Sequence, residues 1–489
     1  MNIKSLKVAD FYILKDFEIE FNNNLSVLIG ENGSGKSTIL ELIADIFGHL
    51  HKFFILNDKT AEFVENYEIV YDYVKDNVPY SIEIHSQQYV DNSSCTFIPK
   101  IWINEEELSI AQIERKYDGM ASLLPQKTIL SYAGISDQLK ALSEHFEEKY
   151  KKEITKANNQ YSLSPLNLPK ERPFIYIKPE HLSMLVVSLL FSDNKQDTDF
   201  LQKYLKKDIH DSRISIVLKK PYWAQKPNEK WWGASGNVAL QFLQTIDLYA
   251  DKEDWDKEKN NILTYHFDGT INLEMAFANL NAYSKDIAFT IFDTLLYDDL
   301  LSEIRVAWDL DDGEEMDLNR LSEGQKQVVL TLGINSVFGD EEKNLLYLFD
   351  EPDVFLHPKW QQSFVDNIRS GLDDTSMAII TSHSPSIVSD LNNQNLHLLR
   401  KGKVVTKSLK YYGKTVDSIL GDFFGLESTR SNTIAERIAS LWKQIQKNDY
   451  KSDSFKKEMQ ELTSILGSDD IEILAMNSDI LRKEYEKNK

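Results

Sequence analysis

Residues 25–42, LSVLIGENGSGKSTILEL, leave few folds open to this chain of 489 residues. An apolar strand pattern runs into a glycine-rich loop, and a helical pattern follows directly. Residues Gly30 to Ser37 fit G-x-x-x-x-G-K-[ST], whose backbone N–H groups can surround a phosphate because glycine has no side chain in the way. The sequence therefore predicts a strand–loop–helix phosphate site within an α/β domain, in preference to an ordinary glycine-rich turn.

The side chains of this loop suit a nucleoside triphosphate bound with a divalent cation. Lys36 can reach the β- and γ-phosphates, and the Ser37 hydroxyl suits Mg²⁺. The helix that begins here directs the positive end of its dipole at the anion. We therefore expect ATP and Mg²⁺ as cofactors. The residues expected to hold the nucleotide here are Gly30, Asn32, Gly33, Ser34, Gly35, Lys36, Ser37 and Thr38.

A second segment of the same site is indicated by NLLYLFDEPD, residues 344–353, an apolar run that ends in two carboxylates. A buried strand ending at Asp350 would place one carboxylate beside the Mg²⁺ ion. Glu351 would then face the attacking water as a general base. An acidic pair after a strand is common, so this assignment depends on the segments around it.

Two such segments flank the acidic pair. RLSEGQKQVVLTLG, residues 320–333, precedes it, and AIITSHSPSIVSDL, residues 378–391, follows it with His383 at the end of an apolar run. The order of P-loop, serine–glycine signature, acidic strand end and histidine resembles that of the ABC-type ATPases. Glu323 stands where a glycine often stands, a variant similar to those of the chromosome-maintenance and DNA-repair branch.

The resemblance implies a site shared between two chains. Ser322 and Gly324 would contact the γ-phosphate bound by another subunit, and Gln325 would also belong to the nucleotide-binding residues. His383 would contact the γ-phosphate in its own site. The chain would close as a head-to-tail dimer, or a higher even oligomer, around its ATP molecules. Bound nucleotide would thus bias a two-state assembly that hydrolysis releases. A lone histidine is more often a core or turn residue, and only this context favours a catalytic role for His383.

The family also has a glutamine that senses Mg²⁺. Gln126, in LLPQKTIL, and Gln138, in ISDQL, both fall in the expected region. The sequence favours neither of them.

Strand and helix patterns divide the chain into four parts. Residues 1–135 read as the N-terminal half of an ABC-type P-loop core, and 136–300 as a mainly helical insertion. Residues 301–410 return to alternating strands and helices and carry the signature, the acidic strand end and the histidine. Residues 411–489 read as a charged helical region. We therefore predict an α/β fold in which a mixed sheet flanked by helices is interrupted by a helical insertion.

Composition restricts the setting and the partners. The net charge of −22 opposes nonspecific nucleic-acid binding, which normally relies on a basic surface. The single cysteine, Cys95, fits a reducing compartment, and the apolar run at 184–191 is too short to span a membrane. The N-terminus lacks the layout of a signal peptide. We expect a cytoplasmic protein that does not contact the membrane.

One basic stretch stands against this acidic background. Residues 201–232 carry eight Lys or Arg against three Asp or Glu, with Tyr222, Trp223, Trp231 and Trp232 interleaved. Basic and aromatic residues together suit DNA or RNA, through phosphate contacts and base stacking. The alternatives are a solvated helix with a packed aromatic cluster, which we favour, and a docking site for an acidic partner.

Several local phrases resemble a narrower group, the ATPase subunits of Septu and retron-associated anti-phage defence systems. These phrases lie at 124–134, 172–190, 231–243, 412–430 and 466–473. The resemblance implies an ATPase that assembles with a separate nuclease of the HNH type and regulates it. After His383 we find no sequence pattern of the metal-dependent nuclease found in the overcoming-lysogenization-defect family, so we expect no nuclease in this chain.

Two other functions stay open. One is a DNA-repair or recombination ATPase that clamps DNA when ATP closes the dimer. The other is a nucleotide-gated scaffold with little turnover, which the presence of Glu351 and His383 disfavours.

Overall fold

The computed structural model describes most of the chain. The described residues are 1–56, 58, 66–91, 94–133, 138–157, 172–191, 195–205, 212–234, 237–255, 260–282, 284–310, 313–339, 342–388, 391, 396–405, 416–424 and 430–487. The chain divides into two compact units, Met1–Lys414 and Thr415–Lys489. Among the described helices, none combines the length and the apolar character that a bilayer crossing requires.

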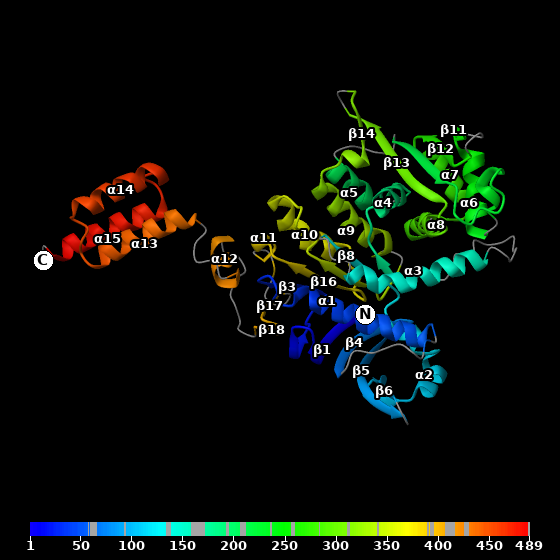
Figure 1. Ribbon diagram of the computed structural model, residues 1–489, viewed down its shortest axis with the longest axis horizontal. Coiled ribbons are helices and arrows are strands. Elements are labelled where there is room, and N and C mark those ends of the chain that lie inside the picture. The colour runs from blue at the N-terminus through cyan, green and yellow to red at the C-terminus, as the bar shows by residue number, and fades with distance from the viewer. Residues whose placement is uncertain are drawn as a thin grey trace. The chain divides into compact units, whose positions relative to one another are not determined.

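A seven-stranded sheet forms the centre of the first unit, in the order β18-β17-β3-β16-β15-β8-β9 (Figure 1). Every neighbouring pair is parallel except β17 and β18. The central strands β3, β15 and β16 are buried along their whole length, which explains their continuous apolar sequences. The strands are β3 (Leu25–Gly30), β8 (Thr128–Tyr132), β9 (Phe174–Tyr176), β15 (Leu346–Asp350), β16 (Met377–Ser382), β17 (Leu396–Arg400) and β18 (Lys403–Val404).

A six-stranded antiparallel sheet, in the order β2-β1-β4-β5-β6-β7, covers helix α1 (Lys36–Phe54) from the other side (Figure 1). One apolar cluster joins α1 to strands of both sheets, for example through the edge-to-face rings of Phe47 and Tyr71. The strands are β1 (Asn2–Phe11), β2 (Leu14–Glu20), β4 (Tyr67–Lys75), β5 (Val78–Asp91), β6 (Ser94–Ile103) and β7 (Glu106–Leu108), followed by α2 (Ile110–Tyr117) and the short helix η1 (Met120–Leu123). The ABC-type α/β core expected from the sequence is confirmed.

The stretch expected to be mainly helical contains strands as well. β10, β11 and β12 join β13 and β14 in a five-stranded antiparallel sheet, in the order β11-β12-β10-β13-β14. The helices are α3 (Gln138–Ala157), α4 (His181–Leu190), α5 (Lys195–Leu205), η2 (Lys230–Gly233), α6 (Asn237–Tyr249), α7 (Ile271–Asn279) and α8 (Lys285–Tyr297). The strands are β10 (Arg213–Lys219), β11 (Lys252–Trp255), β12 (Ile262–Asp268), β13 (Leu301–Asp309) and β14 (Glu315–Asp317).

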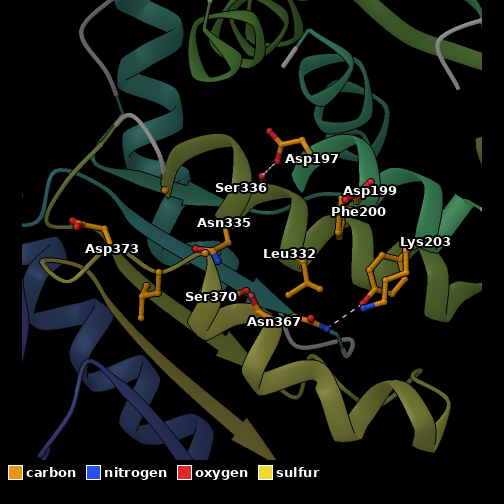
Figure 2. A pocket seen from close by; sticks show the side chains of 14 residues that line it. Asp197, Asp199, Phe200, Lys203, Leu332, Asn335, Ser336, Asn367, Ser370 and Asp373 are labelled. Atoms are coloured by element: carbon orange, nitrogen blue, oxygen red, sulfur yellow. Dashed lines mark hydrogen bonds between the residues drawn. The ribbon is translucent and has the colours of Figure 1, made fainter. Parts of the chain in front are cut away.

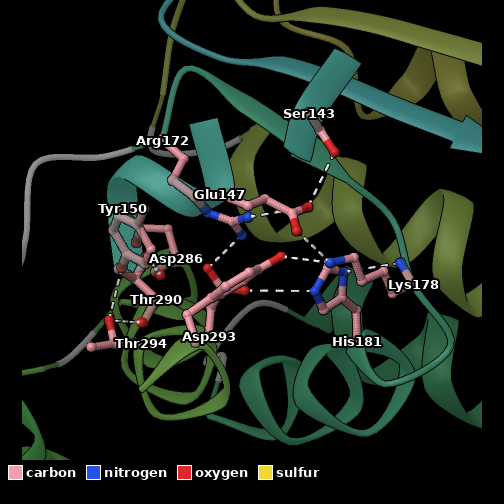
Figure 3. Close-up of polar contacts among 11 residues, drawn as sticks. Ser143, Glu147, Tyr150, Arg172, Lys178, His181, Asp286, Thr290, Asp293 and Thr294 are labelled. Atoms are coloured by element: carbon pink, nitrogen blue, oxygen red, sulfur yellow. Dashed lines mark hydrogen bonds and ion pairs between the residues drawn. The ribbon is translucent and has the colours of Figure 1, made fainter. Parts of the chain in front are cut away.

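A buried polar cluster ties these helices to the edge of the parallel sheet (Figure 3). Arg172, just before β9, donates to Asp293 of α8 over 2.6 Å and stacks on the ring of Tyr297, 4.2 Å from its centroid. Lys178, just after β9, donates to Glu147 of α3 over 2.7 Å. Burial alone would raise the pKa of Asp293, but Arg172 and His181 outweigh it and hold that pKa below its usual value.

Three helices complete the described part of the first unit after the insertion: α9 (Glu323–Gly339), which the short helix η3 (Leu318–Arg320) precedes, α10 (Pro358–Ser370) and α11 (Pro385–Val388). The second unit holds α12 (Val416–Phe424), α13 (Asn432–Gln446), α14 (Asp453–Leu466) and α15 (Ile471–Lys487). The last three pack around one small core that includes Leu441, Leu462 and Met476.

Candidate functional site

The P-loop turns between β3 and α1 with three glycines at positive φ. Gly30, Gly33 and Gly35 have φ of +154°, +74° and +102°. A β-carbon at Gly30 would lie 2.3 Å from the carbonyl oxygen of Leu399, so only glycine fits there. The Lys36 ammonium donates to the Gly30 and Glu31 carbonyls over 3.1 and 3.3 Å. A loop that curls around a buried lysine at a helix N-terminus fits a phosphate group.

The carboxyl end of β15 meets the P-loop through Asp350. The Ser37 hydroxyl donates to Asp350 Oδ1 over 3.0 Å, and Thr381 of β16 donates to the same oxygen. Burial raises the pKa of Asp350, and the hydrogen bonds from Thr381 and Ser37 oppose that rise. A hydroxyl and a carboxylate side by side suit Mg²⁺ that also binds phosphate oxygens. In the described part of the chain, no group of three or more His, Cys, Asp or Glu side chains is placed to hold a metal ion by itself.

Glu351 and His383 lie next to each other at the same edge of the sheet. His383 Nε2 is 3.1 Å from Glu351 Oε1, and both side chains are about one quarter to one third exposed. Glu351 has φ of +50°, a left-handed conformation that is strained for this residue, and its N–H donates to Thr381 Oγ1 over 2.9 Å. Burial, and then the nearby Lys36 charge, lowers the pKa of His383. A histidine with a lowered pKa and a carboxylate thus lie side by side at this edge of the sheet.

The signature serine is exposed at the start of α9. Ser322 caps this helix, since its hydroxyl accepts from Gln325 N–H over 3.3 Å while Gln325 Oε1 accepts from the Ser322 N–H over 3.0 Å. The exposed Glu323 pairs with Lys326, at 2.9 Å. Buried Gly324 packs so closely under the carbonyl of Phe355 that a β-carbon would approach it to 2.6 Å. The segment is therefore a rigid, solvent-facing helix N-terminus.

Two residues that the sequence analysis did not select also belong to this site. Thr381 links Asp350 to the Glu351 backbone, as described above. Asp353 is buried and accepts from the Ser382 hydroxyl, directly before His383, over 2.8 Å. Burial raises the pKa of Asp353 to about 6. Each is a common residue type that no local pattern distinguishes, and only the pairing of β15 with β16 brings them together.

The two candidate Mg²⁺-sensing glutamines differ in position. Gln126 precedes β8 and accepts from the Lys343 N–H over 3.1 Å, at the amino ends of β8 and β15. This is the edge opposite Asp350, so Gln126 does not reach the nucleotide site. The backbone of Gln138 opens α3, but its side chain lies outside the described residues.

The basic stretch 201–232 is described at 201–205 and 212–232, and it mostly serves the fold. Trp232 is buried and donates to the Asn260 carbonyl over 2.7 Å, and Trp231 donates to the Tyr265 hydroxyl over 2.9 Å. Lys219 and Lys230 form ion pairs with carboxylates. Tyr222 is 77% exposed. The packed aromatic cluster favoured in the sequence analysis agrees with this arrangement.

Fold and site together define a P-loop ATPase with an ABC-type core. The chain belongs to the AAA ATPase domain family, whose model matches residues 1–388.

Several individual proteins are also similar to this chain in sequence. The retron Ec83 probable ATPase of Escherichia coli is 22% identical over 522 aligned residues, which cover 98% of this chain and 88% of that protein. The Septu protein PtuA of Bacillus thuringiensis is 33% identical over 108 residues, 20% of this chain and 27% of that protein. The DNA repair protein RecN of Rickettsia bellii is 25% identical over 167 residues, 34% of this chain and 26% of that protein.

Solved structures of ATPase heads align over much of the chain at low similarity. The recombination mediator protein RecF with ATP is 17% identical and has a TM-score of 0.33, over 82% of this chain and 98% of that one. The SMC head domain from Thermotoga maritima is 11% identical with a TM-score of 0.32, over 83% and 98%.

Proposed function

We propose that this chain is an ATP-hydrolysing subunit of an anti-phage defence complex, that it assembles head to tail through shared ATP sites, and that it regulates a separate HNH-type nuclease. The single observation that carries the defence assignment is the similarity to the retron Ec83 probable ATPase. That similarity spans 98% of this chain, and so includes the insertion and the C-terminal unit in addition to the nucleotide motifs.

The shared site is supported by the exposure of the signature. Ser322 caps its helix but faces solvent, and the described hydrogen bonds of its side chain run to Gln325 rather than to the P-loop of the same chain. A helix N-terminus that is already formed and exposed in this way binds anions well. In the proposed assembly, Ser322 and Gly324 of one subunit contact the γ-phosphate held by Lys36 of the other.

The proposed chemistry uses the carboxyl edge of β15 and β16. ATP supplies the scissile phosphoanhydride bond, and Ser37 and Asp350 would hold its Mg²⁺. Glu351 accepts the proton of the attacking water as general base. His383, whose pKa is lowered by burial and by the Lys36 charge, would donate a hydrogen bond at the γ-phosphate. Thr381 and the left-handed backbone of Glu351 fix the direction of its carboxylate.

Replacement of Glu351 by Gln tests the general base and the assembly together. The variant keeps the shape of the side chain but cannot accept a proton, so ATP turnover should fall by about 100-fold or more. ATP should then hold the chain in its assembled form, measured as mass in solution with and without ATP. The matched control is Asp366→Asn, an exposed carboxylate on α10 that pairs only with its neighbour Arg369 among the described contacts. Unchanged turnover in Glu351→Gln would contradict the assignment.

The nuclease partner is tested by co-expression with the HNH reading frame encoded next to this chain, where there is one. We expect the two proteins to copurify and ATP to change the nuclease activity. Copurification without any effect of ATP would contradict regulation.

The DNA-clamp alternative has a weaker basis, because the three tryptophans of the basic stretch donate hydrogen bonds within the fold and only Tyr222 among its four singled-out aromatic residues is exposed. It predicts that neutralising Lys219, Lys220 and Lys226 lowers DNA affinity. We expect no change.

A further inference from the structure

Helix α5 of the insertion contacts both the signature helix and the helix that follows the acidic strand end. The contacts meet at one residue, Tyr204, whose side chain is only 3% exposed. This residue lies in the described part of the basic stretch but carries no charge, and no sequence pattern singles it out. Its surroundings give the insertion a direct connection to the signature.

The connection to the signature runs through Gln325. The Gln325 side chain has two roles: its Oε1 completes the cap with Ser322, and its Nε2 donates to the backbone carbonyl of Tyr204 over 3.0 Å. The donor and the acceptor ends of one amide are thus both used. The position of the helix cap is therefore tied to the position of α5.

The connection to α10 runs through the Tyr204 ring. Asn367 donates to the Tyr204 hydroxyl over 3.1 Å, and Trp360 packs edge-to-face on the ring with centroids 5.6 Å apart. Helix α10 follows the loop that contains Asp353 and Phe355, so it is covalently close to Glu351. Tyr204 thus joins the segment that would act on the neighbouring subunit's ATP to the segment that would hydrolyse its own.

The opposite end of α5 is fixed as well. Buried Asp197 accepts from Lys285 of α8 over 2.6 Å and from Ser336 of α9. Between these two attachments lies a cavity of about 490 Å³ lined by α5, α9 and the end of α10 (Figure 2). The cavity borders the face of α5 that carries Asp199, Phe200 and Lys203, while Leu201 and Tyr204 are buried.

We propose that Tyr204 is a positioning residue for the signature, through which helix α5 of the insertion sets the competence of the shared ATP site. This inference rests on the proposed head-to-tail assembly. Tyr204 itself does not contact nucleotide in this scheme. It holds Gln325, and through Gln325 the Ser322 cap, in register with α10.

Gln325→Glu separates the two roles of the glutamine amide. Glutamate still accepts from Ser322, as in the common S-x-x-E capping box, but it cannot donate to the Tyr204 carbonyl. Loss of this donor, with a carbonyl left facing a carboxylate, should lower kcat by about tenfold or more while KM for ATP stays within about twofold. The melting temperature should stay close to that of the wild type, because the cap persists.

Substitutions of Tyr204 give a graded test. Tyr204→Phe keeps the ring against Trp360 and loses only the hydrogen bond with Asn367, so kcat should fall by a few-fold, roughly what one neutral hydrogen bond contributes. Tyr204→Leu loses both contacts, so its kcat should fall further. Asn367→Leu in the Tyr204→Phe background should add little, since the two residues share one bond. Gln202→Ala, an exposed neighbour on α5, is the matched control.

The readouts distinguish positioning from simple stability. Under the proposal, kcat and ATP-dependent association fall together, whereas nucleotide affinity of the separate chain and the melting temperature do not. Wild-type kcat in Gln325→Glu, or a loss of kcat that follows the melting temperature in every variant, would overturn it. If the wild type itself does not associate with ATP, the proposed function fails; if the wild type and Gln325→Glu associate equally, only the role of Tyr204 fails.

Discussion

Asp298 shows how one buried carboxyl at the end of α8 makes stability depend on pH. It is 3% exposed, and its Oδ1 has no hydrogen-bond partner among the described residues. Burial, with a smaller contribution from Asp299, raises the pKa of Asp298 to about 7. A carboxyl with a raised pKa in the folded state favours folding while protonated. Its contribution is therefore fully present below pH 4 and is lost as the pH rises through about 7.

Asp298→Asn should remove this dependence. The amide stays neutral, so at pH 8 the variant should unfold with a free energy higher than wild type by on the order of 1–3 kcal/mol, and the difference should vanish near pH 4. Denaturant unfolding at several pH values measures it. The control is Asp366→Asn, which changes an exposed carboxylate on α10. A constant difference across pH would contradict the burial argument.

At the residue scale, the sequence predicted what local spacing can carry. Lys36 and Ser37 follow from the P-loop pattern, and Asp350 from an apolar run that ends in a carboxylate. Thr381 and Tyr204 could not be found in this way, because their partners lie far away in the chain and their residue types are common. Gln126 was a reasonable candidate by position, but the direction of β8 puts it at the other edge of the sheet.

Among the elements, the insertion is held to the core by the buried cluster around Arg172 (Figure 3). The Arg172 and Asp293 side chains are only 3% and 6% exposed. Arg172→Met leaves the buried Asp293 charge without its arginine partner and with only His181 beside it, at 3.6 Å, which should lower the free energy of unfolding by about 3–5 kcal/mol. Chemical denaturation followed by circular dichroism measures this loss.

The double variant Arg172→Met, Asp293→Leu provides the control for that prediction. Because both charges are gone, it should recover most of the loss. If the double variant were as unstable as the single one, packing on Tyr297 rather than charge would be the source.

Helices and strands were predictable where apolar residues repeat with a clear helical or strand period. The five-stranded sheet is the main exception. Strands β10 and β12 lie among charged and helical patterns, and β11 has the polar sequence KEDW. Their pairing is antiparallel and partly long-range, since β10 pairs with β13 about 90 residues later in the chain. Such pairing depends on tertiary contacts, so propensity alone indicated a mainly helical insertion.

At the scale of the whole molecule, the proposed head-to-tail ATP sites predict complementation between two inactive chains. A Lys36→Ala chain lacks a working P-loop, and a Ser322→Arg chain lacks a working signature. In an equal mixture, half of the dimers are mixed and each contains one intact site, so ATPase activity should reach about a quarter of the wild-type rate. Steady-state ATPase assays of each chain alone and of the mixture measure this. No recovery in the mixture would contradict the head-to-tail arrangement.

The second unit predicts an independent, weakly stable fold. Helices α13 to α15 share one core of about a dozen apolar side chains within some sixty residues. A fragment covering 430–489 should be helical by circular dichroism. Its free energy of unfolding should be only a few kcal/mol, because a chain of this size buries little surface. A random-coil spectrum would show that the core needs the rest of the chain.

The strand order of the central sheet also determines how late in synthesis the nucleotide site can form. β3, which leads into the P-loop, lies between β16 and β17, so its two sheet partners leave the ribosome roughly 350 residues after it, on the order of 20–70 s later. The antiparallel sheet of residues 2–108 needs no such delay. A nascent chain therefore exposes its phosphate loop without the neighbouring strands that hold it, and we expect it to gain nucleotide binding only after β16 and β17 have emerged.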